Sequence, residues 1–206
     1  MEVCPTDSLH RTANVLGIDL GTCLFCGACE RACMHGIVRF SQDYCLAGRR
    51  REDLIMMPDL APRVEALDSR MRTLFGRSLK LRQVSAGGCN ACEADANVLT
   101  TVVFDIGRFG MEFVASPRHA DGLYVTGPVP ENMREALIKT YEAVPEPKLV
   151  IAVGSCAISG GPFAGLPPAG TGTQEHIPVD LFVPGCPPHP YTFLDGVLRL
   201  LGRIPS

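Results

Sequence analysis

The feature that most constrains this chain is a cysteine pair, Cys89 and Cys92, in the sequence GGCNACE (Gly87–Glu93). Two single cysteines follow much later, Cys156 in GSCAISGG and Cys186 in PGCPP. All three sites are rich in Gly or Pro, so the backbone has room to wrap a bulky inorganic group. Four thiolates arranged in this way suit a tetrahedral metal or a 4Fe–4S cubane better than a pair of disulfides.

Composition indicates the cellular compartment in which such a metal site would function. The 206 residues carry a formal net charge of −3, which gives no reason to expect a nucleic-acid partner. The first residues lack the apolar core of a secretory signal, and disulfides are rare in a reducing cytosol, so the 10 cysteines indicate metal binding in a cytoplasmic protein. No apolar run reaches the roughly 18–20 residues needed to span a bilayer. We therefore expect any attachment to the cytoplasmic face of a membrane to come through partner subunits.

A second cysteine set lies near the N-terminus. Cys23, Cys26, Cys29 and Cys33 follow the C-x2-C-x2-C-x3-C spacing of bacterial ferredoxins. Three closely spaced thiolates can bind three corners of one cubane. A zinc site, the alternative, usually has two separated cysteine pairs. The run therefore predicts a 4Fe–4S cluster in a ferredoxin-like module over residues 1–45.

The fourth ligand of this cluster is either Cys4 or Cys33. In two-cluster ferredoxins the last cysteine of each run binds the other cluster, and Pro follows it. Cys33 is followed by Met34, whereas Cys4 is followed by Pro5. The module then resembles half of a two-cluster ferredoxin, and we favour Cys4, with Cys33 as the alternative. The favoured ligands are Cys4, Cys23, Cys26 and Cys29.

Residues 46–78 differ in character from the module before them and form a predicted connector. Charges cluster here, including the basic run Arg49–Arg51, which we interpret as solvated. Cys45, just before the connector, is predicted to be a buried thiol and not a ligand. Apolar residues then recur at helical spacing and predict one amphipathic helix that ends at Gly76. These residues are Val64, Leu67, Met71, Leu74 and Phe75.

Residues 79–206 alternate between short apolar runs and helical periods, which is typical of an α/β domain with a doubly wound parallel sheet. Each cysteine loop of the first set follows a predicted strand, and open α/β sheets bind ligands at the carboxyl ends of their strands. Loops from three strands can therefore converge on one cluster. The predicted strands cover 79–84, 113–115, 122–126, 148–153 and 178–183, and the predicted helices cover 94–104, 130–141 and 191–201.

Four motifs in the same order make the chain resemble a known family. GGCNACE, SPRHADGLYVTGPV, GSCAISGG and PVDLFVPGCPP resemble the small, proximal-cluster subunit of group 4 nickel–iron hydrogenases, which is similar in turn to the 20 kDa, B-type subunit of respiratory complex I. The resemblance covers residues 75–201 and implies a flavodoxin-like fold. It also implies docking against a large subunit that holds the nickel–iron centre and performs the chemistry. The implied ligands of a proximal 4Fe–4S cluster are Cys89, Cys92, Cys156 and Cys186.

Two details distinguish the hydrogenase relatives from the complex I relatives. B-type subunits carry adjacent cysteines at the first ligand site, whereas Asn90 and Ala91 separate the pair here, which is the hydrogenase-like form. The segment 159–176 differs from the longer, tyrosine-containing segment that borders the quinone cavity in complex I relatives, so we do not expect quinone chemistry. The alternatives are a complex I-type electron-transfer subunit and a non-redox scaffold with degenerate sites. Intact cysteine sets argue against the scaffold.

Three further residues match motifs of this family. Glu93 directly follows Cys92 and is either a proton-transfer group at the subunit interface or an acid favoured by a helix N-terminus. Arg118 and His119 belong to SPRHAD. We expect them at an interface or beside the cluster ligands, where Arg118 would tune the cluster potential through a hydrogen bond.

Together these features predict an electron-transfer subunit of a multisubunit nickel–iron hydrogenase, with two 4Fe–4S clusters. The catalytic residues are expected on another subunit. The expected partners are the nickel–iron large subunit, a further iron–sulfur subunit or ferredoxin, and membrane subunits of the same complex.

Overall fold

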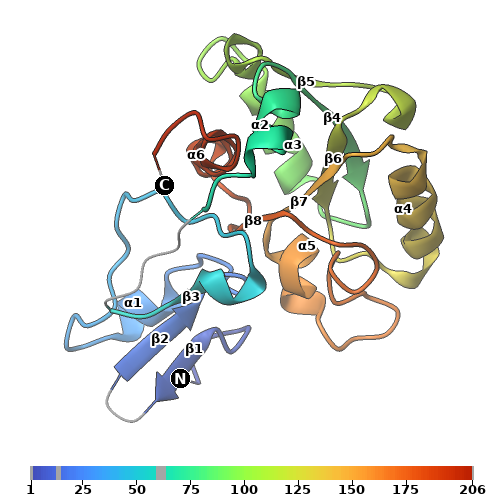
Figure 1. The fold of residues 1–206 in the computed structure, drawn as a ribbon. Helices are drawn as coiled ribbons and strands as arrows, with labels where there is room; N and C mark the ends of the chain where they lie inside the picture. The colour runs from blue at the N-terminus through green and yellow to red at the C-terminus, as the bar shows by residue number, and fades with distance from the viewer. Residues whose placement is uncertain (1, 13–14, 59–63, 206) are drawn as a thin grey trace.

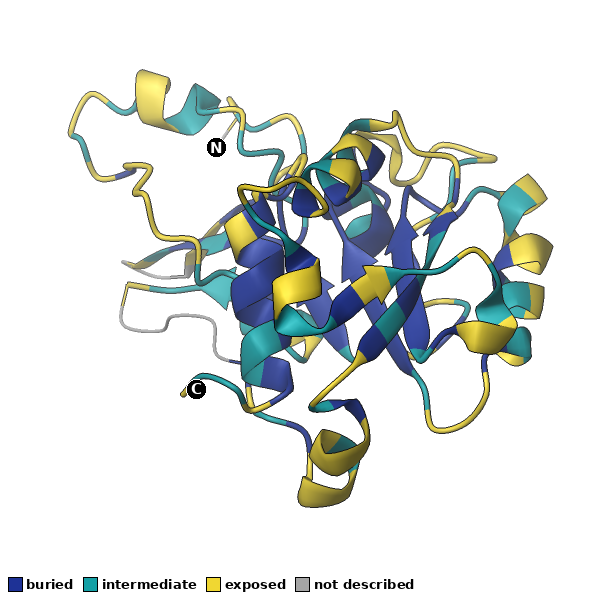
Figure 2. Ribbon diagram, turned by 90° about the horizontal axis from the view of Figure 1, so that it is seen from above, coloured by how far each residue is buried: buried dark blue, intermediate teal, exposed yellow. Residues whose placement is uncertain are grey.

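Figure 1 shows the computed structural model of the chain, which describes residues 2–12, 15–58 and 64–205. A small N-terminal module, in blue, lies beside a larger α/β domain that runs from green to red. Figure 2 shows that burial is concentrated in the strands of the larger domain and the helix beside them, whereas the N-terminal segment extends outward and is mostly exposed.

A five-stranded parallel sheet organises the larger domain. Its strand order is β5-β4-β6-β7-β8, and every neighbouring pair is parallel. Counted from β4, this is the 2-1-3-4-5 order of flavodoxin-like folds, so the predicted fold class is confirmed. The strands are β4 (Leu79–Ser85), β5 (Met111–Phe113), β6 (Gly122–Thr126), β7 (Leu149–Val153) and β8 (Leu181–Val183).

Helices cover both faces of this sheet. One apolar core packs α3 (Ala91–Leu99) and α6 (Pro190–Leu200) against one face. A separate apolar core packs α4 (Glu131–Ala143) against the other face. All residues of β6, β7 and β8 are buried, which explains why these strands are nearly continuous apolar runs and do not alternate with polar residues.

The N-terminal module is built on a three-stranded antiparallel sheet of order β1-β2-β3. Its third strand comes from the segment predicted to be a connector, so residues 55–56 are part of the sheet of the module. The elements are β1 (Leu9–Thr12), β2 (Val15–Asp19), α1 (Ala28–Ala32), the 3₁₀ turn η1 (Arg51–Leu54) and β3 (Ile55–Met56).

The module packs against the sheet domain beside α5 (Ser155–Ser159). Leu20 and Leu54 share an apolar cluster with Phe182 of β8 and with residues of α5. The backbones of Gly48 and Phe182 also exchange two hydrogen bonds, of 3.0 and 2.8 Å. Since β8 is an edge strand, this pairing covers an edge that would otherwise be open to other chains.

Two predicted helices have different bounds in the structure. α2 covers only Ser69–Phe75, because the Asp68 side chain accepts the backbone N–H of Met71 and caps the helix there. Val64 and Leu67 lie before the helix and are buried in an irregular segment. α3 starts earlier than predicted, at Ala91 between the two cysteines of its loop, and it also ends earlier. Residues 59–63 of the predicted connector lie outside the described residues.

The prediction that the basic run is solvated holds for Arg50, which is exposed, and is wrong for Arg51. Contrary to the solvated position expected for the basic run, Arg51 forms an ion pair with Asp19 of β2, with Nη2 2.6 Å from Oδ2.

The remaining elements are 3₁₀ turns: η2 (Ile106–Phe109), η3 (Pro117–His119) and η4 (Gly161–Phe163). Over the stretches that the structure describes, none of the helices has the length and hydropathy required to cross a membrane.

Candidate metal centres

Four cysteines lie beyond the carboxyl ends of three strands of the parallel sheet. Cys89 and Cys92 follow β4, and Cys92 lies in the first turn of α3. Cys156 lies in α5 directly after β7, and Cys186 follows β8. Cys89 and Cys186 are exposed, whereas the other two are half-buried. The loops therefore meet at one edge of the sheet, and the site opens at the surface of the chain.

Burial and neighbouring charges raise the pKa of three of these thiols: Cys92, Cys156 and Cys186. Burial, followed by the charges of Glu93 and the other three cysteines, raises the pKa of Cys92 to about 12. Burial, followed by the charges of Cys186 and Cys89, raises the pKa of Cys156 to about 11. Thiols in this state stay protonated until a cation arrives, because a bound metal removes the proton from a coordinating thiol. The donor set therefore fits a cationic iron–sulfur core with four thiolate ligands.

Two glycines give the backbone close access to these sulfurs. A Cβ added at Gly154, where φ is +89°, would lie 2.6 Å from the Sγ of Cys92. A Cβ added at Gly161 would lie 2.8 Å from the Sγ of Cys156. Both distances are too short for any side chain, so only glycine permits this approach. The cysteine loops are thus shaped closely around their sulfur atoms.

Glu93 is buried at the base of this site. Its Oε1 accepts hydrogen bonds of 2.6 Å from the hydroxyls of Ser85 and Thr126. Burial raises the pKa of Glu93, but these two hydrogen bonds and its own backbone N–H outweigh burial, and the pKa lies below its ordinary value. The ionised carboxylate therefore ties the start of α3 to β4 and β6.

A cavity of about 650 Å³ lies between the N-terminal module and residues that follow β8, and Cys4, Cys23, Cys26 and Cys29 all line it. Burial raises the pKa of Cys23 to about 11, with contributions from the charges of Cys29, Cys4 and Cys26. As in the sheet domain, four thiols surround a common space. This donor set also fits an iron–sulfur core.

Backbone N–H groups already point at two of these sulfurs. The N–H of Ser8 donates to the Sγ of Cys4 at 3.2 Å, and the N–H of Phe25 donates to the Sγ of Cys23 at 3.3 Å. Hydrogen bonds to ligand sulfurs are one of the means by which proteins tune iron–sulfur clusters. Cys4 therefore has the environment of a ligand although it lies far from the other three in sequence.

Cys33 has a separate environment at the C-terminal end of α1. Its Sγ accepts the N–H of Ile37 at 3.2 Å, and the backbone N–H groups of Val38 and Ile37 lower its pKa. Within the described part of the chain, Cys33 is not among the residues that line the cavity. The geometry thus groups Cys4, and not Cys33, with the other three cysteines.

A site for a single metal ion requires a tighter arrangement. In residues 2–12, 15–58 and 64–205, no group of three or more His, Cys, Asp or Glu side chains is placed to hold one metal ion. A cubane places its four ligands on separate iron corners, so four thiols spread around a space match its requirements. The two cysteine sets are therefore candidate ligands for iron–sulfur clusters.

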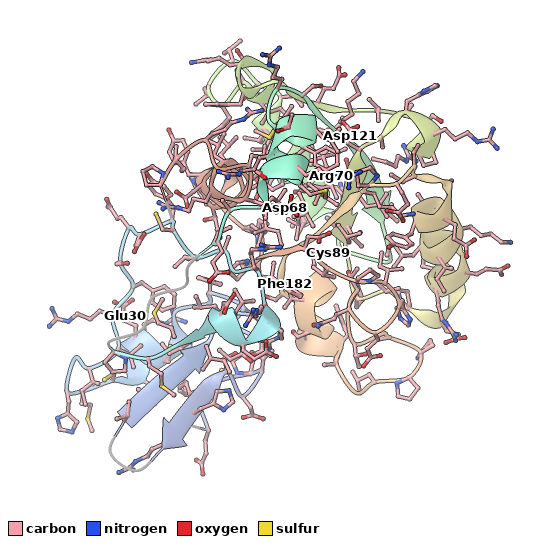
Figure 3. All side chains as sticks on the ribbon, in the orientation of Figure 1. Glu30, Asp68, Arg70, Cys89, Asp121 and Phe182 are labelled. Atoms are coloured by element: carbon pink, nitrogen blue, oxygen red, sulfur yellow. The ribbon has the colours of Figure 1, made fainter. Side chains whose placement is uncertain are left out.

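Cys45, Arg118 and His119 lie away from the two cysteine sets. The half-buried thiol of Cys45 receives a hydrogen bond from Arg199 at 3.6 Å, which ties the N-terminal module to α6. Arg118 and His119 are exposed in η3, before β6 begins. Figure 3 shows Asp121, which directly precedes β6, well separated from Cys89 at the opposite end of the strands. This position favours the predicted interface role over a hydrogen bond from Arg118 to the cluster.

Comparison with known proteins agrees with this architecture. Residues 89–200 match the family described as NADH ubiquinone oxidoreductase, 20 Kd subunit, which is more than half of the chain. The chain belongs to this family. The resemblance predicted from the four motifs is therefore confirmed, and the matched region starts at the first cysteine of the sheet domain.

Relatives within the family belong to different oxidoreductases. The probable membrane-bound hydrogenase subunit mbhJ of Pyrococcus furiosus is 41% identical over 142 residues, which are 69% of this chain and 85% of that protein. An NADH-quinone oxidoreductase subunit of Heliobacterium modesticaldum is 43% identical over 120 residues, 58% of this chain and 69% of that protein. A chain in the structure of the membrane-bound sulfane sulfur reductase, an archaeal respiratory membrane complex, has a TM-score of 0.56 and 31% identity over 66% of this chain and 75% of that chain. The chain is thus a hydrogenase-type or complex I-type subunit of an oxidoreductase complex.

Sequence reasoning missed two polar residues, one that stabilises the module internally and one that joins it to the sheet domain. Arg51 binds Asp19 within the module, and Ser155 donates a hydrogen bond to the carbonyl of Cys23. Both contacts connect residues far apart in the chain. The one available signal was the position of Ser155 directly before a predicted ligand.

Proposed function

We propose that this chain is the electron-transfer subunit of a multisubunit nickel–iron hydrogenase and carries two 4Fe–4S clusters. The observation that carries the proposal is the gathering of two separate sets of four cysteines in one chain of this family. Each cluster would supply a site that gains and loses one electron. The proximal cluster would exchange electrons with the catalytic centre of a partner subunit. The N-terminal cluster would exchange electrons with a further iron–sulfur carrier.

The ligands of the proximal cluster are proposed to be Cys89, Cys92, Cys156 and Cys186. Those of the N-terminal cluster are proposed to be Cys4, Cys23, Cys26 and Cys29. The cavity that Cys4 shares with the other three cysteines supports Cys4 over Cys33, because both sulfurs accept a backbone N–H at 3.2 Å and only Cys4 lines the cavity.

The proposed partners follow from which of the proposed ligand cysteines are exposed at the surface of the chain. Cys89 and Cys186 are exposed, so a partner surface would cover the proximal cluster. That partner is proposed to be the large subunit that holds the nickel–iron centre. A further iron–sulfur subunit or ferredoxin would dock near the N-terminal module. Membrane subunits would hold the complex at the cytoplasmic face.

A complex I-type role is the second candidate, and a specific observation favours it. The matching family carries the name of the 20 Kd subunit of NADH ubiquinone oxidoreductase, and the NADH-quinone oxidoreductase relative is 43% identical over the aligned residues. The two residues between Cys89 and Cys92 support the hydrogenase role instead.

The decisive experiment is purification of the chain together with its large partner subunit. Bound nickel and hydrogen turnover would support the hydrogenase role, whereas a partner without nickel would contradict it and favour the complex I-type role. For the clusters, iron and sulfide analysis with EPR of the reduced chain is expected to give two distinct 4Fe–4S signals. A single signal would contradict the proposal.

Two serine variants test the ligands of the N-terminal cluster. Cys4→Ser is expected to abolish the N-terminal EPR signal, and Cys33→Ser is expected to keep it. Loss of that signal in Cys33→Ser alone would overturn the proposed set.

In the purified complex of this chain with its large partner subunit, hydrogen turnover by Glu93→Gln tests the proposed proton-transfer role of Glu93. Unchanged turnover would leave Glu93 with its structural contacts only.

A further inference from the structure

The N-terminal module and the sheet domain meet at one buried hydroxyl. The Oγ of Ser155 lies 2.5 Å from the carbonyl oxygen of Cys23 and 3.2 Å from the carbonyl oxygen of Gly185. Ser155 is 2% exposed, so water does not compete for these contacts. A short hydrogen bond therefore crosses the boundary between the two parts of the chain.

The residues that this hydroxyl joins belong to both cysteine sets. Cys23 is a proposed ligand of the N-terminal cluster. Ser155 is bonded directly to Cys156, and Gly185 is bonded directly to Cys186, both proposed ligands of the proximal cluster. A path from one set to the other thus consists of covalent bonds along the backbone and one hydrogen bond.

The surrounding contacts hold this geometry without depending on Ser155 alone. Ser159, one turn along α5, donates its hydroxyl to the carbonyl of Gly21 at 3.0 Å. The cavity that holds the N-terminal cysteines is also lined by Pro184, Gly185 and Pro187, the residues around Cys186. The cavity that holds the N-terminal cysteines therefore reaches the loop that carries Cys186.

We propose that the Ser155 hydroxyl provides the path for one-electron exchange between the two clusters. The proposal rests on the proposed function, because it requires both clusters. Electron tunnelling weakens less across covalent and hydrogen bonds than across a gap between atoms. One electron would pass from the reduced cluster to the oxidised one, without movement of a proton or a change in any covalent bond, while Ser155 would keep its hydrogen bond to Cys23. Since the hydroxyl binds a ligand carbonyl and no ligand sulfur, it has little effect on either reduction potential.

The test compares Ser155→Ala with Ser159→Ala in the full chain with both clusters present. Each variant loses one hydroxyl of α5 that binds a carbonyl of the module, but only Ser155→Ala interrupts the path. Rapid photoreduction followed by freeze-quench EPR measures the rate of exchange between the clusters. Ser155→Ala is expected to slow it severalfold, because the electron must then cross a gap where the hydrogen bond was. Ser159→Ala is expected to leave it unchanged.

Two further measurements distinguish a role of Ser155 in the electron path from a role in positioning the N-terminal module against the sheet domain. Dipolar EPR spectroscopy gives the distance between the clusters, and redox titration gives their potentials. Both are expected to be unchanged in Ser155→Ala, and Ser155→Thr, which keeps a hydroxyl, is expected to retain the original rate. An unchanged rate in Ser155→Ala, or a slower rate with a changed distance, would overturn the proposal. Absence of a second cluster from the unmodified chain would instead contradict the proposed function, and this inference with it.

Discussion

In the sheet domain every residue of β6, β7 and β8 is buried, whereas α1 of the N-terminal module buries none. The sheet domain has apolar cores on both faces. The module has a three-stranded sheet of short strands, and Leu20 and Leu54 pack in a cluster shared with the larger domain. Small modules with so little core of their own need metals or cross-links to fold. The two parts of the chain therefore differ in what an iron–sulfur cluster contributes to them.

Removal of iron tests this difference most strongly. Chelation of oxidised protein is expected to remove amide protection from β1 and β2, because binding of metal supplies folding energy where the apolar core is small. Amides of β6 and β7 are expected to keep their protection, since their packing involves no cysteine. Hydrogen exchange measured by mass spectrometry follows both regions in one sample. Equal loss of protection in β2 and β7 would contradict the comparison.

A single glycine variant tests whether a cluster site in the sheet domain can be lost without loss of the fold. Gly154→Ala would place a Cβ 2.6 Å from the Sγ of Cys92, at a φ of +89°. The proximal EPR signal is expected to disappear, while the N-terminal signal and the circular dichroism of the sheet persist. The change in iron content measures the loss directly.

Gly165→Ala is the matched control for this variant. Gly165 has a φ of +78°, but an added Cβ would meet no atom within 4 Å. Backbone strain of about 1–2 kcal/mol is then the main expected cost, and both clusters are expected to remain. Loss of the proximal signal in Gly165→Ala as well would attribute the effect to strain and not to crowding of the sulfur.

The sheet domain was more predictable from sequence than the module. β6 matches the predicted 122–126, and β7 lies within the predicted 148–153, because short apolar runs bounded by Gly or Pro are a strong signal. α2 is shorter than its apolar pattern predicts. Leu67 is buried by tertiary packing and donates its N–H to the carbonyl of Leu200 at 2.8 Å, so its helical spacing does not reflect a helix.

The same distinction applies to the sites. The cysteine loops of the sheet domain were predictable because topology brings the carboxyl ends of parallel strands to one edge. The contacts of Ser155 with Cys23 and of Arg51 with Asp19 depend on how the module folds and docks. No local pattern records such contacts, so their partners were found only in the structure.

A variant of Arg51 tests how much contacts other than the cysteines contribute to the stability of the module. Its guanidinium binds both carboxylate oxygens of Asp19, at 2.8 and 2.6 Å. Among the residues that the structure describes, Arg51→Ala would leave the largely buried carboxylate with the N–H of Gly21 as its remaining hydrogen-bond donor. The opening free energy of β2, measured by hydrogen exchange, is expected to fall by about 2 kcal/mol.

Lys139→Ala is the control for Arg51→Ala. Lys139 pairs with Glu135 at 2.6 Å, but both side chains are exposed on α4. Loss of such a surface pair is expected to change stability by less than about 1 kcal/mol. An effect of Arg51→Ala as small as that of Lys139→Ala would show that this ion pair contributes little to the stability of the module.

Glu93 gives the smallest expected effect, because the sheet domain around it keeps its apolar core. Its folded pKa lies below the ordinary value of about 4.3, so its contribution to stability is fully present above that value and is lost as pH falls through the lower folded pKa. Glu93→Gln is expected to lower the free energy of unfolding by about 1 kcal/mol at neutral pH and to reduce its decline in acid.

Urea denaturation of the sheet domain across this acidic range measures both effects, with Glu112→Gln as the matched control. Glu112 is exposed and pairs only across the surface with Lys80, at 3.2 Å. It is therefore expected to leave the pH dependence nearly unchanged. If Glu93→Gln kept the acid dependence of the unmodified chain, the hydrogen bonds from Ser85 and Thr126 would not favour the ionised carboxylate. Glu93 would then again be a candidate for proton transfer beside the proximal cluster.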